Sequence, residues 1–173
     1  MNQLVFQPAL DPLHAAFRIL RLRSILSESP PLHVEHVRIL DFFLLFPFRI
    51  RSLRLAPSHQ HYKALAEKYA HLAPYGEQPD SELLFERMKP MQIAALETLA
   101  LRGYIDEGSF KAGIFKPTQN EIPIELADRI SRINYEQSDL VDFLRILATG
   151  YDVSGENGLK ARSQLMDSRY DAI

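Results

Sequence analysis

The sequence predicts a mainly α-helical protein with one small β-hairpin. Apolar residues recur three and four positions apart along most of the chain, which is the spacing of one helix face. Pro or Gly separates these stretches, and both residues commonly begin or end helices. Only residues 104–117 predict paired strands, because two short apolar segments lie there between glycines. The expected helices cover residues 12–27, 33–46, 57–72, 81–89, 90–102, 122–133, 140–149 and 159–173.

The stretch from Ser81 to Pro117 predicts two helices followed by the hairpin. A short helix from Ser81 ends near Lys89, and Pro90 suits the first position of the next helix, where an N–H would have no partner. Gly103 is placed to end that second helix in the left-handed conformation. A helix ending in Leu-Arg-Gly-Tyr-Ile before a small hairpin resembles the third helix and wing of winged-helix domains.

The length of 173 residues fits one domain. The expected organisation is a winged-helix-like core over about residues 33–118 and a helical C-terminal extension over residues 122–173. Gly155 and Gly158 predict a flexible link within that extension. The final helix then carries a thin apolar line, which would be weakly held without a second surface, at Leu159, Met166, Tyr170 and Ile173.

Composition and charge limit the classes of function. Hydrophobic residues make up 46% of the chain and charged residues 24%, which is typical of a globular protein. The formal net charge of −2 gives no overall attraction to nucleic acid. Residues 1–56, however, hold seven Arg and only four acidic residues. Any anion-binding role therefore belongs to this first third.

The chain contains no Cys, which excludes disulfides, thiol catalysis and cysteine zinc sites. No basic segment precedes an apolar run at Met1, so no secretory signal is expected. The most apolar run, from Ile39 to Phe48, is interrupted by Asp41 and is much shorter than the roughly 20 residues of a membrane helix. These observations predict a cytoplasmic protein without a membrane segment.

The first helix is expected to start at Asp11, which can cap its free N–H groups, and Pro12. Its apolar coverage is broad, and it leaves one polar stripe at Asp11, His14, Arg18 and Arg21. The stripe has two interpretations, a solvated face or a surface that binds a partner. Arg is enriched at interfaces, which is the argument for the second interpretation.

The second helix, about residues 33–46, is the most apolar in the protein, with only a thin polar row at Glu35, Arg38 and Asp41. Such a helix is either the central strut of the core or part of a subunit interface, and both roles are compatible. The candidate partner-binding residues from the first two helices are Asp11, His14, Arg18, Arg21, Arg38 and Asp41.

Residues 48–55 alternate apolar and basic side chains at first. As a strand they would place Arg49 and Arg51 on one face; as an irregular turn they would scatter them, or they form an edge that the arginines keep soluble. The second helix of the 81–117 stretch offers few groups that could read base edges, which disfavours sequence-specific DNA binding. The candidates for contacts to the DNA backbone are Arg49, Arg51, Arg54 and Lys116.

The chain shows no motif for catalysis or phosphate binding, so no enzyme activity and no cofactor are expected. An unrecognised enzyme would require a deep pocket with convergent ionisable groups. Two histidine pairs, His33 with His36 and His59 with His61, have metal-like spacing, but neither has an obvious third ligand. Polar surface histidines are the preferred interpretation, and no metal site is expected.

The N-terminal third carries a family resemblance. The segment Pro8-Ala9-Leu10-Asp11-Pro12-Leu13-His14-Ala15-Ala16-Phe17-Arg18, followed by Val37-Arg38-Ile39-Leu40-Asp41-Phe42 and Leu44-Leu45-Phe46-Pro47, resembles the small middle component of ABC-three-component bacterial defence systems. Those systems include the Lamassu anti-phage group. The likeness runs from about residue 5 to about residue 117.

The resemblance implies a non-enzymatic subunit that bridges an SMC/Rad50-like ATPase and an effector, commonly a nuclease. It also implies that DNA contact belongs to the assembly, and it carries over no catalytic residue. Docking on the ATPase is expected through the first two helices and the C-terminal helix. The rival interpretation is that these faces pack on one another within the monomer. The alternative function is a winged-helix transcriptional regulator, which would bind duplex DNA on its own.

Overall fold

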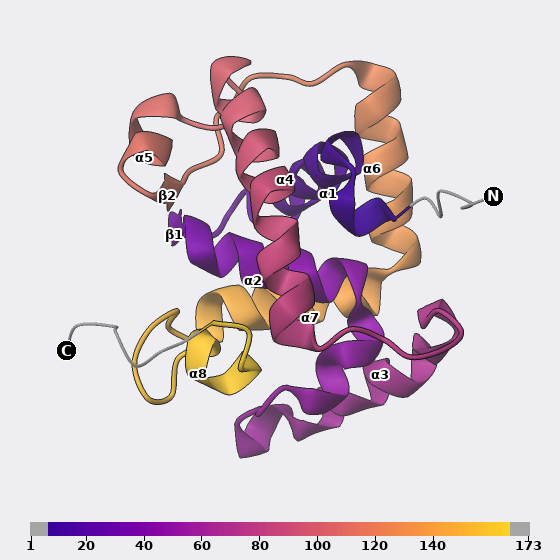
Figure 1. The fold of residues 1–173 in the computed structure, drawn as a ribbon. Helices are drawn as coiled ribbons and strands as arrows, with labels where there is room; N and C mark the ends of the chain where they lie inside the picture. The colour runs from indigo at the N-terminus through magenta and orange to yellow at the C-terminus, as the bar shows by residue number, and fades with distance from the viewer. Residues whose placement is uncertain (1–6, 167–173) are drawn as a thin grey trace.

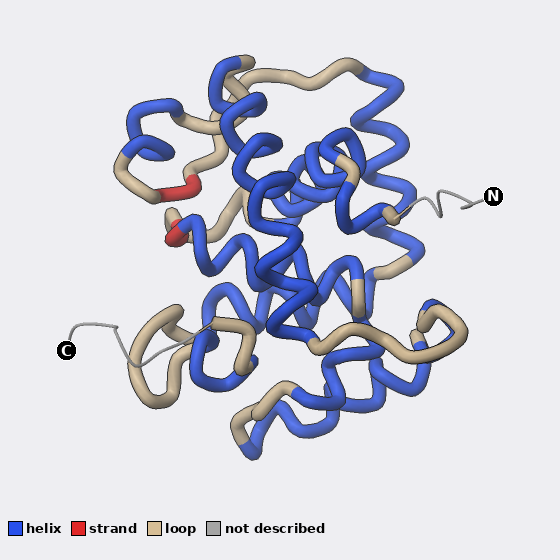
Figure 2. Tube along the Cα trace, viewed as in Figure 1, coloured by secondary structure: helices blue, strands red, loops and turns tan. Residues whose placement is uncertain are grey.

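The chain folds as a layered group of helices with one very small sheet, as a computed structural model shows for residues 7–166 (Figures 1 and 2). The mainly α-helical prediction is confirmed. The α-helices are α1 (Pro12–Ile25), α2 (Val34–Leu45), α3 (Ala64–Lys68), α4 (Ser81–Leu101), α5 (Glu107–Lys111), α6 (Ile124–Glu136), α7 (Ser138–Gly150) and α8 (Leu159–Ser163). The 3-10 helices are η1 (Pro8–Leu10), η2 (Pro47–Ser52), η3 (Pro57–Lys63) and η4 (Ala70–Leu72), and the strands are β1 (Leu32–His33) and β2 (Ile114–Phe115).

Helix α2 is the centre of the core. Every residue from His36 to Leu44 is buried, and α1, α4, α7, α8 and η2 all pack against the helix (Figure 1). Phe42 makes edge-to-face contacts with Phe43, Phe46 and Phe85, with ring centroids 5.3–5.8 Å apart. The predicted central strut is therefore confirmed. A hydrophobic cluster around this helix extends from Ala9 to Leu165.

Helix α1 begins as the sequence predicts. The Asp11 carboxylate accepts a hydrogen bond from the backbone N–H of His14 at 2.9 Å, and Pro12 occupies the first helical position. The helix ends at Ile25, two residues before the predicted end.

Helix α4 differs from the prediction, because residues 81–101 form one continuous helix with Pro90 inside it. Proline removes one N–H donor and ordinarily kinks or breaks a helix interior. Here the side chains before and after Pro90 form one buried face, which includes Phe85, Met88, Leu96 and Leu99, while Pro90 itself faces solvent. Packing on α1 and α2 thus outweighs the lost hydrogen bond, and the predicted helix–turn–helix is wrong at this point.

The helix end at Gly103 is as predicted. Gly103 has φ +76°, its N–H donates to the Ala100 carbonyl, and the Tyr104 N–H donates to the Leu99 carbonyl. These two bonds form a Schellman motif, which satisfies carbonyls that the helix end leaves free.

The two ends of the segment 104–117 run antiparallel to each other, but the segment does not form a simple hairpin. Asp106 N–H donates to the Lys116 carbonyl at 2.9 Å, and Ile105 bridges to Pro117. The predicted tip instead forms α5, capped by Asp106, and β2 pairs with β1, which precedes α2. The second strand therefore finds a partner some 80 residues away in the chain. This arrangement establishes a small antiparallel sheet, but not a winged-helix domain.

The two segments between α2 and α4 show further differences. Residues 47–52 form η2, so neither the strand nor the irregular turn is correct, and residues 57–72 form three short helical pieces instead of one helix. The predicted helices over residues 122–133 and 140–149 are confirmed as α6 and α7.

The C-terminal helix is much shorter than predicted. Helix α8 ends at Ser163, and Gln164 adopts the left-handed conformation with φ +57°. Tyr170 and Ile173 of the predicted apolar line lie outside the described residues. Within residues 7–166, no helix has the length and apolarity needed to span a bilayer.

Candidate functional site

The most concentrated group of charged and amide side chains lies inside the protein, where α1, α2 and α4 meet. The Arg18 guanidinium donates to both Asp41 oxygens, at 2.7 and 3.0 Å, and also to the Pro8 carbonyl at 3.1 Å. Gln92 Nε2 donates to the same carboxylate at 2.9 Å, while Gln92 Oε1 accepts from Arg38 Nε at 2.9 Å. We call Arg18, Arg38, Asp41 and Gln92 the central polar network; each is at most 4% exposed.

This network has a net positive charge, because it contains two guanidinium groups and one carboxylate. The second guanidinium, that of Arg38, lies 4.4 Å from the centre of the Phe85 ring, and its Nη2 has no hydrogen-bond partner among the described residues. Burial lowers the pKa of Arg38, opposed by the negative charges of Glu86, Glu35 and Asp41. The network is closed to solvent and its members bind one another, so it acts as a clamp between three helices.

Four of the six candidate partner-binding residues lie in this interior. Arg18, Arg38 and Asp41 belong to the network, and Arg21 is 7% exposed and donates to the side chains of Asn134 and Gln137 on and beside α6. Burial lowers the pKa of Arg21 to about 10. The expected exposed stripe is therefore wrong for Arg18 and Arg21, whereas the burial of Arg38 and Asp41 agrees with the central-strut interpretation of their helix.

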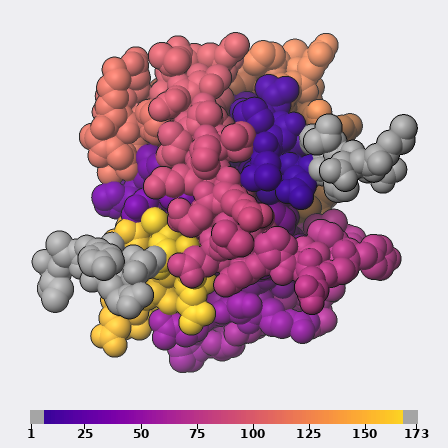
Figure 3. Space-filling view, viewed as in Figure 1, coloured from indigo at the N-terminus to yellow at the C-terminus, as the bar shows by residue number. Residues whose placement is uncertain are grey.

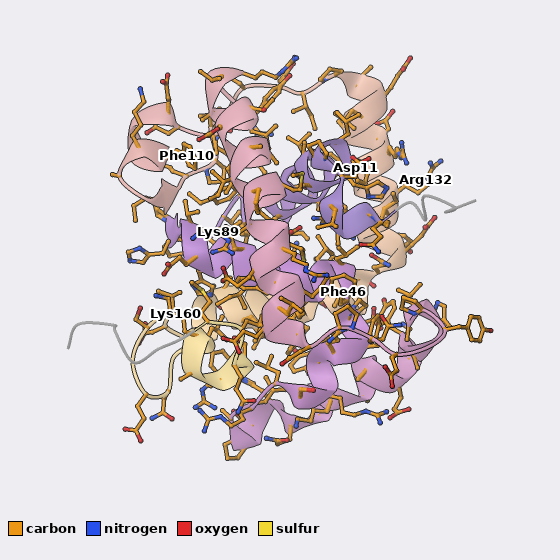
Figure 4. All side chains as sticks on the ribbon, viewed as in Figure 1. Asp11, Phe46, Lys89, Phe110, Arg132 and Lys160 are labelled. Atoms are coloured by element: carbon orange, nitrogen blue, oxygen red, sulfur yellow. The ribbon has the colours of Figure 1, made fainter. Side chains whose placement is uncertain are left out.

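The other two candidate partner-binding residues, Asp11 and His14, lie at the start of α1. Asp11 is half-buried as the helix cap, and His14 is exposed. Helix α1 packs beside α6, where the Phe17 ring lies 4.9 Å from the guanidinium of Arg129; Figure 4 labels Asp11 at the start of α1 and Arg132 on α6. The faces of the first two helices therefore pack mainly within the monomer, as the rival interpretation holds.

The four candidates for DNA-backbone contact do not form one patch. Arg49 is half-buried and donates to Ser81 Oγ and the Pro79 carbonyl, at 2.6 and 3.0 Å, and burial lowers its pKa. Arg51 pairs with Glu67, and Arg54 donates to the Ala161 carbonyl.

The fourth candidate, Lys116, directly follows β2, which pairs with β1 at the start of α2. The three arginines follow the end of α2. Because the 12 residues of α2 span about 18 Å, Lys116 lies at the opposite end of this helix from the arginines. Backbone contact by these residues stays a prediction.

The histidines also separate into interior and surface positions. His36 is 3% exposed, its Nε2 lies 3.0 Å from the Leu147 carbonyl, and burial lowers its pKa. His59 Nδ1 lies 2.7 Å from the Tyr151 hydroxyl, while His33 and His61 are exposed. Among the described residues, no three His, Asp or Glu side chains are grouped as a metal would require.

Sequence reasoning missed Arg23, which holds the 104–120 segment against α1. Its guanidinium donates to the carbonyls of Tyr104, Thr118 and Asn120 at 2.6–2.7 Å. Because its acceptors are backbone groups about 80–100 residues away, no pattern around Arg23 could have identified them. Beside this clamp lies an open groove of about 520 Å³ between α1, α6 and residues 117–122.

The comparison with known families decides the identity. Residues 4–171 match the family described as ABC-three component (ABC-3C) system Middle Component 5. The chain belongs to this family. No curated protein and no solved structure matches it significantly. The predicted middle component of an ABC-three-component system is therefore confirmed at the level of the family.

The middle component exposes large apolar side chains on several separate elements. At the start of α1, Leu10 is 40% exposed and Leu13 81%. One turn after Leu13, the half-buried Phe17 ring lies 4.9 Å from the guanidinium of Arg129 on α6. We call Leu10, Leu13, Phe17 and Arg129 the α1–α6 face. It combines an apolar surface with one exposed positive charge, a composition common in interface anchors.

Proposed function

We propose that this middle component is a non-catalytic accessory subunit of a cytoplasmic, Lamassu-type anti-phage defence complex, in which it bridges an SMC/Rad50-like ATPase subunit and an effector nuclease. The family match over residues 4–171 carries this proposal, because a middle component of a three-component system implies other components to contact. The bridging role and the identities of the two partners are the steps beyond that match.

A non-catalytic role is supported by the polar side chains, several of which are bound by other side chains of the same chain. Arg18, Asp41 and Gln92 bind one another, and the carboxylate of Asp139 is held by Lys68 and Tyr69. The groove beside Arg23 is lined mainly by apolar and neutral polar side chains. A catalytic site needs ionisable groups that converge on a space open to substrate.

We assign docking on the ATPase subunit to the α1–α6 face. Leu13 is exposed over most of its surface although it lies on a helix whose other side is in the core. An exposed apolar group beside a cation is suited to a partner surface that offers an apolar pocket and a carboxylate.

The test is co-expression of the tagged middle component with the other two components of its system. Wild type is expected to retain both, and Leu13→Glu with Arg129→Glu is expected to reduce the retained ATPase subunit by at least about tenfold, since a buried charge without a partner strongly weakens an interface. The matched control is Ile124→Glu, because Ile124 is 72% exposed at the first position of the same helix α6, whereas Arg129 lies near the middle of that helix.

Two outcomes would contradict the proposal at different levels. If wild type retains neither component, the accessory role is wrong. If the double variant assembles like wild type, or if only Ile124→Glu disrupts assembly, the role stands but the α1–α6 face is not the docking site.

A further inference from the structure

Helix α4 carries an exposed apolar line along its whole length. Its buried side includes Phe85, Met88 and Leu96, yet Leu83 near its start is 48% exposed and Leu101 at its end is 78% exposed. Pro90 and Ala94, both small and exposed, lie between them. Figure 3 shows α4 running down the middle of the visible face, with its outer side uncovered. A surface helix ordinarily presents a polar outer face, and this apolar line is therefore a surface that a partner helix could cover.

The exposed residues are arranged symmetrically about the level of Gln92, which points into the core. Pro90 and Ala94 are each two residues from Gln92, and Leu83 and Leu101 are each nine residues away. Nine residues are two and a half turns, so both leucines lie on the side opposite Gln92. Two pairs of charges follow the same symmetry with opposite signs, whereas Glu86 and Lys89 have the uncharged counterparts Thr98 and Ala95. Arg87 and Glu97 are five residues from Gln92, and Glu82 and Arg102 are ten.

We propose that two copies of this chain pair through α4, antiparallel, about a two-fold axis level with Gln92. In a two-fold interface, if one residue contacts a second, the second contacts the first in the other copy. Leu83 then lies level with Leu101 of the second copy, and the small Pro90 and Ala94 allow the two backbones to approach. This inference does not depend on the proposed bridging role.

The charges select the antiparallel arrangement. Antiparallel pairing brings Arg87 level with Glu97 of the second copy. Parallel pairing in register would instead place Arg87 level with Arg87, and Glu97 level with Glu97, of the second copy. Like charges facing each other across an interface are unfavourable, and opposite charges fix the register. Within residues 7–166, no hydrogen bond or ion pair engages the side-chain charges of Arg87, Glu97 or Arg102. They are therefore available to a second copy.

The first experiment measures the mass of the purified full chain by sedimentation velocity across a range of concentrations. Wild type is expected to dimerise, and Arg87→Glu is expected to raise the dimer dissociation constant by at least about tenfold, because it creates like charges at two symmetric positions. Adding Glu97→Arg to that variant should restore wild-type dimerisation. The matched control is Arg132→Glu, an exposed arginine on α6, which should leave dimerisation unchanged.

Because the chain has no Cys, disulfide trapping reads out the register directly. Leu83→Cys with Leu101→Cys should form a covalent dimer under mild oxidation, whereas Leu101→Cys alone should not. The two positions are 18 residues apart on one helix, about 27 Å, so they cannot bond within one chain.

A wild-type chain that stays monomeric at every concentration overturns the proposal. So does a dimer that resists Arg87→Glu, or one that is trapped by Leu101→Cys alone. If Leu101→Glu instead lowers retention of another component while wild type alone is monomeric, the line on α4 binds that component and not a second copy.

Discussion

The centre of α2 and the η2 segment that follows it carry the same charged chemistry in opposite surroundings. In α2, Asp41 pairs with Arg18 of α1 where the two side chains are 0% and 4% exposed. In η2, Arg51 pairs with Glu67 of α3 where they are 67% and 70% exposed. The first pair holds two core helices in one position, whereas the second adds a contact that water can replace. The contribution of an arginine to the stability of this fold therefore depends on whether its ion pair is buried or exposed to water.

The buried pair forms because two polar rows face each other. Helix α2 is enclosed on all sides, so its single polar row must meet another polar group. Helix α1 supplies Arg18, and α4 supplies Gln92, which binds both Asp41 and Arg38. Replacing one member of a buried pair leaves a charge without a partner, which costs much more than the pair itself contributes.

The largest effect is expected from Asp41→Asn. Asparagine keeps the size of the side chain but leaves the Arg18 guanidinium buried without a counter-charge, so the free energy of unfolding should fall by about 3–5 kcal/mol. Urea unfolding followed by circular dichroism measures the change.

The matched control for this prediction is Glu67→Gln, which makes the same kind of substitution in the exposed pair. It should change the free energy of unfolding by less than about 1 kcal/mol. Equal effects of Asp41→Asn and Glu67→Gln would show that burial does not separate the two pairs.

Local features of this fold could be predicted from the sequence. Asp11 and Gly103 act on neighbouring backbone groups, so their roles as helix cap and helix end are visible within a few residues. The composition of α2 predicts a helix covered on nearly all sides, but leaves open whether the core or a partner subunit covers it.

Contacts between distant segments could not be predicted. The polar rows of α1 and α2 were each visible, but nothing in the spacing says that Arg18 meets Asp41 rather than solvent. Likewise Pro90 is a local signal for a helix start, and only the shared buried face of residues 84–100 overrides it. The partners of Arg23 are carbonyls, which carry no sequence signal.

A second prediction uses pH to compare the same two regions. Burial lowers the pKa of His36 in α2 below its ordinary value of 6.5. As pH falls below about 6.5, the unfolded chain therefore binds a proton that the folded chain resists, and stability is lost by at most about 1.4 kcal/mol per pH unit. The free energy of unfolding, measured from pH 7.5 to 5.5, should decrease less steeply in His36→Gln than in wild type.

The control for this pH dependence is His61→Gln, since His61 is exposed in η3. Its slope against pH should match that of wild type. If His36→Gln keeps the full acid sensitivity, the buried imidazole is not its source, and the carboxylates must be considered instead. Asp139 would then be the first candidate. Burial alone would raise its pKa, but hydrogen bonds from Lys68, Tyr69 and the backbone of Leu140 lower it overall, so its contribution is lost only in stronger acid.

The smallest effect is expected from Arg51→Gln. Both partners of this ion pair are mostly in water, where the Coulomb attraction is screened and ordering two long side chains costs entropy. The free energy of unfolding should change by less than about 0.5 kcal/mol. A double-mutant cycle with Glu67→Gln should give a small coupling energy. This coupling energy should decline further in 0.5 M salt, where the Debye length is only about 4 Å. A coupling of about 2 kcal/mol that persists in high salt would place this pair with Arg18 and Asp41, and the distinction between the two regions would fail. If the coupling is near zero, Arg51 contributes little to the fold, and its charge is available to a ligand such as a phosphate backbone at little cost to stability.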